Sequence, residues 1–532
     1  MSNINGNSRF SLAPQADIQR SIFDRSHSHK TTLDAGKLVP IYCEEVLPGD
    51  TVTMDMSTVC RMTTPLYPVM DNAYLDTHWF FVPYRLVWDH WREFCGENTD
   101  PWAQDTVYEV PHGSVFANFG SFWDYIGVPP QTFCDVSALP LRAYRLIWNE
   151  WYRDQNLQHN ELVDTGDSAE ITYDEAELLP VNKYKDYFTS CLPTPQKGDP
   201  VLLPLGEWAP VYTRNQSVPS DGSLIGLKWG YAGNATTASV LISGSAGVGN
   251  TVLGTASGAT QNTAEPTNLW ADLGTATAAT VNQLRQAFAI QRLLEADARG
   301  GTRYRELVKA HFGVDTGDAR VQVPEYLGGK HIPINVSQVI QQSAAADEPT
   351  PLGNTGAFSK TVDRAGLFTK SFVEHGLLMG FVSVRTDHTY QQGIPRYLMR
   401  RQRYDFYWPE LANIGEQPVK LAEIYAAGDN TNTLVFGYQE AWADYRYSPN
   451  RVSGAFRSSS PQSLDVWHYA DDYQSRPYLS STWVEETDSN IARTLAVQDS
   501  EVADQFLLDT YFQARWARPM PLYSVPGLNG HF

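Results

Sequence analysis

The stretch "HWFFVPYRLVWDHWREFCGE" (78–97) joins two different apolar patterns at a single proline. Residues 73–83 alternate as a strand does, and this strand must end at Pro83, because proline cannot donate a hydrogen bond to a ladder. After Pro83 the apolar residues take a helical spacing, and Gly96 stands where a helix would stop. The expected faces are Ala73, Leu75, Thr77, Trp79 and Phe81 on the strand, and Val87, Trp88, Trp91, Phe94 and Cys95 on the helix.

Two interpretations of these rings compete: a packed structural junction, or an aromatic binding surface for sugar or nucleic acid. The large residues fall on the periodic faces of a strand and a helix, and such faces normally pack against other elements. The spacing therefore favours a structural junction. Its expected members are Trp79, Phe81, Pro83, Trp88, Trp91 and Phe94.

The rest of the chain also consists mainly of strands and turns. "VPIYCEEVLPGDTVTMDMSTVCRM" (39–62) alternates around "LPGD" and predicts a hairpin. "LRAYRLIWNEWYRDQN" (141–156) predicts a second aromatic helix, and a capping box at Thr280 and Gln283 begins a third that ends near glycines 300–301. No alternating βαβ pattern is present. The sequence thus predicts a mainly β fold, a β-sandwich or jelly roll with long loop and helical insertions.

Two segments differ in composition from this framework. Residues 1–40 hold five cations against three acidic residues and lack periodicity, so they are expected to form a basic N-terminal arm or a floppy terminus. Residues 229–264 contain no charged residue. Disordered linkers are usually charged or rich in proline, so we expect an insertion that orders against a neighbour, with a flexible loop as the alternative.

Composition restricts the functional classes. With a net charge of −20, the whole surface cannot coat nucleic acid, so any such contact needs local basic patches or a partner. No apolar run approaches the roughly 18 to 20 residues that cross a bilayer, and the polar start lacks a signal peptide's apolar stretch. We therefore expect neither export nor membrane insertion. Five cysteines without a C-x-x-C pair argue against disulfides and zinc.

No motif indicates an enzyme, a cofactor or a metal. The glycine-rich "GSAGVGN" (244–250) lacks the Lys-Ser/Thr ending of a phosphate loop, and His27 and His29 are two imidazoles without further ligands. A glycosidase needs two facing carboxylates, which Asp471, Asp472, Glu485 and Glu486 could supply only if the fold brought them together. The abundant Trp and Tyr keep a glycan-binding or carbohydrate-active β-sandwich as the alternative function.

Basic residues beside aromatic rings are the strongest binding signal. "RYLMRRQRYDFYW" (396–408) sets arginines among rings; arginines bind phosphates, and aromatic faces stack on unpaired bases. The alternative is an aromatic strand whose arginines form ion pairs between subunits. Together with the arm, the candidate nucleic-acid contacts are Arg9, Arg20, Arg25, Lys30, Arg400, Arg401 and Arg403.

Long segments in a fixed order resemble the major capsid protein of microviruses, in particular the gokushovirus branch of these small icosahedral single-stranded-DNA phages. They include "FDRSHSHKTTLDAGKLVPIYCEEVLPGDT" (23–51), "FFVPYRLVWDHWREFCGE" (80–97), "LPLRAYRLIWNEWYRDQNL" (139–157), "KDYFTSCLPTPQKGDPVLLPLG" (185–206), "NQLRQAFAIQRLLEADARGGTRYRELVKAHFGV" (282–314), "PEYLGG" (324–329), "YQQGIPRYLMRRQRYDFYWPELANIGEQPV" (390–419) and "RPMPLYSVPGL" (518–528). The resemblance implies an eight-stranded antiparallel jelly roll whose copies form a T=1 icosahedral shell around circular single-stranded DNA.

The resemblance also implies an organisation and a set of partners. Residues 1–40 would be an inward-facing arm, and 41–532 a jelly-roll capsid domain that includes a variable surface insertion at 207–280, near the three-fold axes. The implied partners are further copies of the chain clustered in pentamers, the packaged DNA, a small basic DNA-packaging protein with other virion proteins, and a receptor on the bacterial surface. The protein would be located in the virion and assembled in the host cytoplasm.

Overall fold

The structure is a computed structural model that describes residues 18–97, 107–168, 176–201, 281–343, 352–499 and 502–524, together with five short strands between 211 and 271. The chain divides into two compact units. Unit 1 comprises Met1–Pro195 and Asp297–Phe532, and unit 2 comprises Gln196–Ala296.

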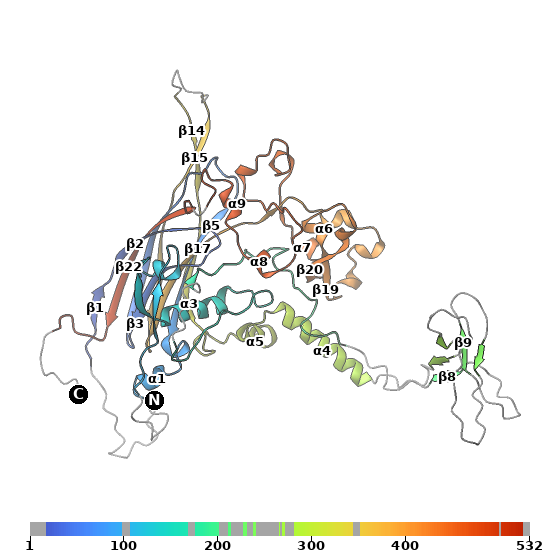
Figure 1. The fold of residues 1–532 in the computed structure, drawn as a ribbon, viewed down its shortest axis with the longest axis horizontal. Helices are drawn as coiled ribbons and strands as arrows, with labels where there is room; N and C mark the ends of the chain where they lie inside the picture. Colours follow the sequence, from blue (N-terminus) through green and yellow to red (C-terminus); the bar gives the residue numbers. More distant parts are fainter. Residues whose placement is uncertain are drawn as a thin grey trace, which may run out of the picture. The chain divides into compact units, whose positions relative to one another are not determined.

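Two antiparallel sheets form the centre of unit 1 (Figure 1). The first sheet has the order β1-β22-β4-β16, and β2 also pairs with β22; its strands are β1 (Ser21–Asp24), β2 (His27–Leu33), β4 (Thr51–Met62), β16 (Thr361–Ser371) and β22 (Phe506–Arg518). The second sheet has the order β13-β5-β17-β3; its strands are β3 (Val39–Val46), β5 (Ala73–Pro83), β13 (Glu325–Pro333) and β17 (Gly376–Thr386).

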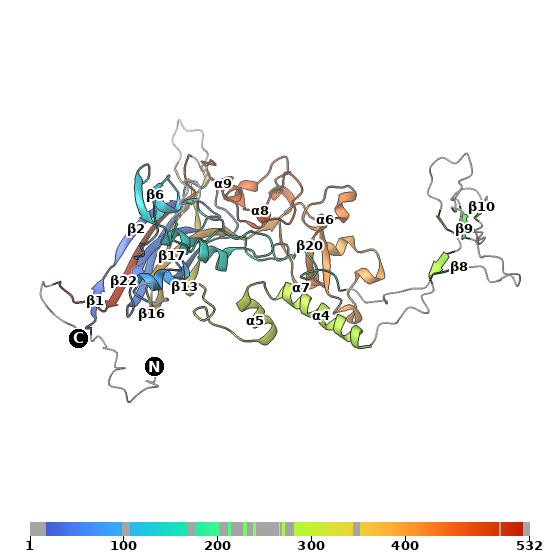
Figure 2. The same ribbon diagram turned by 60° about the horizontal axis from the view of Figure 1, so that its bottom comes forward.

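Both faces of strands β5 and β17 are buried, because the second sheet is the middle one of three packed layers. One face of the second sheet meets the first sheet in a core to which Trp79, Phe81 and Leu378 contribute. The opposite face carries Phe80 and the neighbouring Val82, and it packs against α2, α3 and the turn after β5. Figures 1 and 2 show the β22 sheet, the β17 sheet and α3 as successive layers.

Trp79 is at the centre of the inner core. Its ring lies 5.2 Å from that of Tyr42 and 5.8 Å from that of Phe512, so it connects strands of both sheets. The cross-strand partner of Trp79 on β17 is Gly380, where an added Cβ would stand 2.9 Å from the indole ring. The glycine therefore provides the space that the tryptophan ring occupies.

Short helices and small ribbons surround the sheets. The helices are α1 (Trp91–Phe94), α2 (Phe122–Tyr125), α3 (Leu139–Ile147), α4 (Val281–Arg299), α5 (Tyr304–Phe312), α6 (Leu421–Ile424), α7 (Ala443–Arg446), α8 (Ser481–Val484) and α9 (Ser489–Ala492). The two-stranded ribbons are β6 (His112–Phe116) with β7 (Phe133–Ser137), β14 (Val336–Ile340) with β15 (Thr355–Ser359), β18 (Thr389–Tyr390) with β21 (Asn450–Arg451), and β19 (Glu416–Lys420) with β20 (Val435–Glu440). A third apolar cluster lies among α6, α7, α8 and β20.

Unit 2 contains most of α4 and the five short strands. Two small sheets are present, β10-β9-β11 and β12-β8, with strands β8 (Val211–Thr213), β9 (Leu227–Gly230), β10 (Ala238–Val240), β11 (Glu265–Pro266) and β12 (Leu269–Ala271). Most of the expected insertion at 207–280 lies outside the described residues.

The predicted hairpin at residues 39–62 is wrong in its pairing, although its two strands exist. β3 pairs with β17 in the second sheet, whereas β4 pairs with β16 and β22 in the first. The "LPGD" turn therefore carries the chain from one sheet to the other. Alternation shows which face of a strand is apolar, and both strands turn that face to the same core, but it does not select the partner strand.

Two further expectations need correction. The arm expected at 1–40 is not free along its whole length, because His27–Leu33 pairs with β22 from Phe512 to Phe506 and Ser21–Asp24 pairs with the end of that strand. The helix expected after Pro83 is shorter: α1 covers one turn, and Gly96 follows it with φ +97°. By contrast, the strand ending at Pro83 and the helices near 141 and 281–299 are confirmed.

Truncating the central ring should destabilise unit 1 far more than truncating an exposed ring of the same stretch. We expect Trp79→Ala to lower the free energy of unfolding by about 3–5 kcal/mol, because a large cavity opens between the sheets. The matched control Phe94→Ala, at a ring that is 44% exposed, should cost about 1 kcal/mol or less. Urea unfolding of the unassembled chain measures both, and equal losses would contradict the central role of Trp79.

Candidate functional site

The arginine–aromatic segment forms an exposed surface made of turns. Residues 396–411 fold as three short 3₁₀ turns rather than the aromatic strand considered from the sequence. The large side chains of this segment point outward instead of entering a core. The exposed rings here and on the adjoining α7 segment are Tyr397, Tyr404, Phe406, Tyr407, Trp408, Tyr445 and Tyr447.

The three candidate arginines of this surface differ in their surroundings. Arg400 forms an ion pair with Asp444 and lies 4.3 Å from the Tyr445 ring centre, with only 7% of its side chain exposed. Its charge is thus neutralised within the chain. Arg403 lies 4.8 Å from the Trp408 ring centre, and within the described part of the chain neither the Arg403 nor the Arg401 side chain forms an ion pair, although the Arg401 backbone amide donates to Asp405 at 2.8 Å. These two remain available to an anion.

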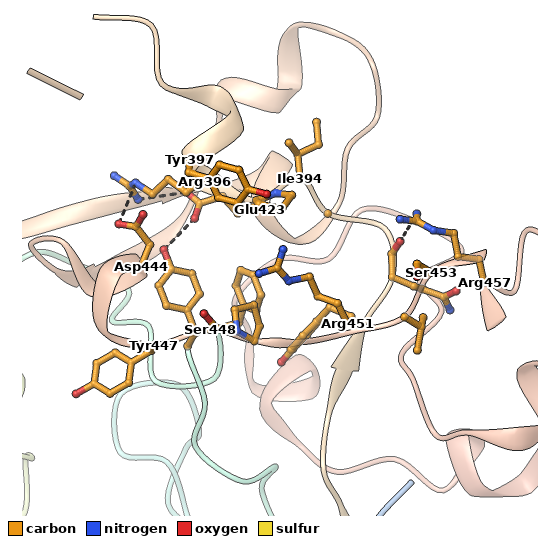
Figure 3. A pocket seen from close by; sticks show the side chains of 18 residues that line it. Ile394, Arg396, Tyr397, Glu423, Asp444, Tyr447, Ser448, Arg451, Ser453 and Arg457 are labelled. Atoms are coloured by element: carbon orange, nitrogen blue, oxygen red, sulfur yellow. Dashed lines mark hydrogen bonds and ion pairs between the residues drawn. The ribbon is translucent and has the colours of Figure 1, made fainter. Parts of the chain in front are cut away.

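A cavity of about 480 Å³ adjoins this surface (Figure 3). Its wall combines aromatic rings with arginines, and the sequence had not indicated that these residues meet. The rings are Tyr187, Phe188, Tyr390, Tyr397 and Tyr447, and the arginines are Arg396, Arg451 and Arg457. The volume is within the usual range for small-molecule sites.

The two carboxylates in the cavity wall already have partners. Glu423 accepts hydrogen bonds from the Tyr187 hydroxyl at 2.8 Å and from Arg396 at 3.2 Å. Asp444 is held by Arg400 and lies 3.9 Å from Arg396. Arg451, by contrast, has no carboxylate partner among the described residues, and Figure 3 shows its side chain directed into the cavity. The cavity therefore offers a positive charge among flat rings.

The candidate cations of the arm lie on or beside the first sheet. Arg20 donates to the Thr51 hydroxyl at 2.6 Å, Arg25 pairs with Glu44 at 2.6 Å, and Lys30 pairs with Asp509 at 3.2 Å. Arg9 lies outside the described residues. Two of these charges are thus partly neutralised within the chain, although the Lys30 pair is exposed and so contributes little to stability.

Lys30 shares a shallow groove with two cations that the sequence did not indicate. The groove has a volume of about 730 Å³, and its wall also contains Arg61, Lys360 and the exposed Val362. In the described part of the chain, neither Arg61 nor Lys360 contacts a carboxylate. This groove and the cavity beside Arg451 share no wall residue, so the structure brings the candidate cations together in two groups.

The aromatic side chains of the junction differ in their burial and do not form one continuous buried stripe. Trp79, Phe81 and Trp88 are buried, and Trp88 also donates from its indole to Asp167 at 2.8 Å. Trp91 is partly buried and packs against Tyr84 with ring centres 4.5 Å apart, whereas Phe94 is exposed. No binding cavity described above includes these rings.

Two of the four carboxylates considered for glycoside hydrolysis, Asp471 and Glu486, instead flank a buried histidine, while Asp472 accepts from Gln392 at 3.1 Å and Glu485 from Gln158 at 2.9 Å. His388 donates from Nδ1 to Asp471 at 3.1 Å and from Nε2 to Glu486 at 2.9 Å. Lys183 lies 3.7 Å from Asp471, and all four side chains are buried. Because both carboxylates are occupied inside the protein, they cannot flank a sugar.

Electrostatics explain why this network keeps its charges. Burial alone would lower the pKa of His388, but Asp471 and Glu486 raise it to about 10. Burial would likewise raise the pKa of Asp471, yet Lys183 and His388 hold it well below its usual range. The network thus connects the segment after β17 to the loops near α8 and α9 through buried ions whose opposite charges balance one another.

The described residues contain no group of three or more His, Cys, Asp or Glu side chains that could hold a metal ion. Within those residues, no helix is long and apolar enough to span a membrane. All five cysteines are free thiols, and burial raises the pKa of Cys60 to about 12, which keeps that thiol protonated.

Sequence reasoning missed Arg451 and Arg457, although a signal was present. The segment "YRYSPNRVSGAFR" (445–457) mixes arginines with aromatic residues, as 396–408 does. Arg61 and Lys360 offered no such signal, because each is a single cation at the end of a strand. Only the pairing of β4 with β22 and β16 brings them near Lys30.

The charge network predicts a pH-dependent stability. Because the pKa of His388 is raised from its ordinary 6.5 to about 10, its contribution is complete below pH 6.5 and is lost as the pH rises toward 10. We expect His388→Gln to lower the free energy of unfolding by about 3–5 kcal/mol at pH 6.5. This deficit should shrink by pH 10, as measured by urea unfolding across that range.

The matched control for this experiment is His90→Gln. His90 is partly exposed and bonds one carboxylate, Asp167, at 2.9 Å, so its replacement should cost about 1 kcal/mol or less. A His388→Gln deficit that stays constant between pH 6.5 and 10 would show that the imidazole is not charged in the folded protein.

Comparisons with known proteins agree with this largely structural arrangement. The family described as "Capsid protein (F protein)" matches residues 11–528. Capsid protein VP1 of Bdellovibrio phage phiMH2K is 41% identical, with 98% of both chains covered. The VP1 capsid proteins of Spiroplasma virus 4 and Chlamydia phage 1 are 41% and 39% identical, with 98% of this chain and 97% of each relative covered. The chain therefore belongs to the microvirus capsid protein family, in its gokushovirus branch, whose members are structural proteins of the virion.

Proposed function

We propose that this chain is the major capsid protein of a T=1 icosahedral shell that encloses circular single-stranded DNA. The observation that carries the proposal is the match to capsid proteins over nearly the full length of both chains. We infer a structural role without catalysis, because two of the carboxylates considered for hydrolysis, Asp471 and Glu486, are occupied by His388. In this proposal the chains cluster as pentamers and assemble in the host cytoplasm.

We further propose that the two sheets form an eight-stranded jelly roll. β1 and β2 pair with successive parts of β22, Arg515–Arg518 and Phe506–Phe512, so together they fill one edge position. Each sheet then has four strand positions. The "LPGD" turn, which connects one sheet to the other, supports this arrangement, because jelly-roll strands alternate between two sheets.

We propose that the packaged DNA meets the shell at the two basic groups. At the cavity, Arg451 would bind a phosphate, with Arg401 and Arg403 on the adjoining surface, while tyrosine rings stack on an unpaired base. The groove with Lys30, Arg61 and Lys360 would contact further phosphates, as would Arg9, Arg20 and Arg25 of an inward-facing arm. Because the chain as a whole carries a net charge of −20, a small basic DNA-packaging protein and other virion proteins would supply further positive charge.

The insertion at 207–280 would be the variable surface element that projects near the three-fold axes and meets a receptor on the host bacterium. Its charge-free stretch at 229–264 supports a segment that packs against protein surfaces rather than DNA. The glycan-binding alternative makes a different prediction, namely sugar binding by the isolated chain, which a glycan array tests directly.

Electron microscopy of particles from infected bacteria tests the main proposal. We expect small isometric shells built mainly from this chain, with T=1 symmetry and the DNA inside. A chain that remains strictly monomeric under conditions in which the capsid relatives assemble would overturn it.

Removing the uncompensated charges should lower DNA retention without preventing assembly. We expect particles of the Arg401→Gln, Arg403→Gln, Arg451→Gln triple variant to package several-fold less DNA per shell than wild type, because each lost cation removes a phosphate contact. The measurements are particle yield by sedimentation and DNA per particle by absorbance.

A matched triple variant controls for the change in net charge. Arg285→Gln, Arg292→Gln and Arg320→Gln replace exposed arginines outside both basic groups. An equal loss of DNA in this control would show that only net charge matters, and an unchanged DNA content in the first variant would remove these arginines from the DNA contact.

Deleting residues 230–262 should leave unit 1 folded and alter host attachment. The deletion lies within unit 2, whereas the two large sheets belong to unit 1. We expect an unchanged thermal unfolding midpoint for the main transition and weaker adsorption of particles to host cells. Global unfolding of the variant would show that the segment is part of the main fold, and unchanged adsorption would refute its role in attachment.

A further inference from the structure

Within the described part of the chain, no third strand pairs with the ribbon formed by β14 and β15. Its two strands pair in register from Val336 with Ser359 to Ile340 with Thr355, and no other described strand joins them. Pairing continues one step further, because Gln341 donates to the Asn354 carbonyl at 2.9 Å. Figure 1 shows the ribbon extending beyond the ends of the large sheets.

At its base the ribbon joins the rest of unit 1, where Val336 packs against the core between the two sheets. The Ser359 hydroxyl donates to the Asn335 carbonyl at 3.0 Å, and the Asn335 amide donates to the Thr361 hydroxyl at 2.9 Å. Further out, apolar side chains are exposed on both faces: Val339 (47%) and Phe358 (50%) on one, and Ile340 (50%) on the other. An isolated two-stranded ribbon is marginally stable in water, so this one gains from being covered.

The ribbon also lacks the devices that normally protect exposed strand edges. Soluble proteins place lysines, prolines or bulges on such edges to prevent pairing with other chains. Residues 335–343 and 352–359 contain no charged residue and no proline, although 19% of the whole chain is charged. The pairing of β14 with β15 has no register shift that would mark a bulge. These edges are therefore competent to pair with another strand.

These features identify the kind of partner. Residues 335–343 and 352–359 offer no Lys or Arg side chain to a phosphate backbone, so they lack the charge that dominates such binding. Depletion of charge together with exposed apolar side chains is typical of the buried centre of a protein–protein interface. Since the chain belongs to a family of shell-forming proteins, the protein available to every copy in equal number is another copy of itself.

We propose that the β14–β15 ribbon is an assembly contact, which a second copy of this chain buries through strand-edge pairing and apolar packing. This inference rests on the proposed shell function and assigns one of its contacts. If the same strand of two copies paired antiparallel, both copies would contribute the same surface, as a contact across a two-fold axis requires.

Lysines introduced at the exposed apolar positions test the contact. We expect the Val339→Lys, Phe358→Lys double variant to fold like wild type, with an unchanged thermal unfolding midpoint, because both side chains are already exposed. In the assembled state the lysines would be buried without partners, so shell formation should be lost in sedimentation and electron microscopy. The matched control, Val339→Ile with Phe358→Leu, keeps both positions apolar and should assemble normally.

The outcomes separate this inference from the shell proposal. If wild type and the control fail to assemble, the shell proposal fails. If wild type and the lysine variant both assemble normally, the ribbon is not a contact between copies, and altered host adsorption of that variant would assign it to the outer surface. A lower unfolding midpoint of the lysine variant would show that the ribbon packs within its own chain, which also overturns the inference.

Chemical labelling gives a second measurement that does not depend on a disruptive substitution. In a Cys95→Ser background, which removes the exposed thiol, Val339→Cys should react with a maleimide in the free chain. The inference predicts loss of this labelling in assembled shells. Equal labelling of free chains and shells would overturn it.

Discussion

The fold of this capsid protein depends on a sheet that must be covered on both faces. β5 and β17 carry large apolar side chains on alternate positions of either face, so neither face can remain in water. The β22 sheet covers one face around Trp79, and α3 with its neighbours covers the other around Phe80. The long segment between β5 and β13 therefore supplies part of the core. This explains why an aromatic strand and an aromatic helix occur close together in the sequence.

Local periodicity made part of this architecture predictable. The strand ending at Pro83 and the helix near 141 follow from spacing and from a proline, because each depends on nearby residues. The partners of β3 and β4 could not be predicted, since alternation defines a face but not a neighbour. The strand at "HSHKTTL" (27–33) was not predicted, because its polar side chains give no apolar alternation and it joins the sheet edge mainly through its backbone.

The candidate site was predictable only in part, for an electrostatic reason. The sequence identified cations beside rings, but it did not show which cations have a carboxylate partner. Arg400 and Arg25 are paired with Asp444 and Glu44, whereas Arg401 is not. Likewise Asp471 and Glu486 are far from His388 in sequence, and only the fold assembles the network. A net charge of −20 thus gives little information about where positive potential remains.

The position of β22 has a consequence for how the protein is made. This late strand, Phe506–Arg518, is internal to its sheet and pairs with β4 on one side and with β1 and β2 on the other. The first sheet therefore remains incomplete until residues 506–518 have been synthesised and have left the ribosome. Contacts between residues so far apart in the sequence slow folding. Before β22 is in place, the edges of β4 and β2 that it will occupy are exposed to other nascent chains. Closure of this sheet therefore competes with premature aggregation while the protein is being made.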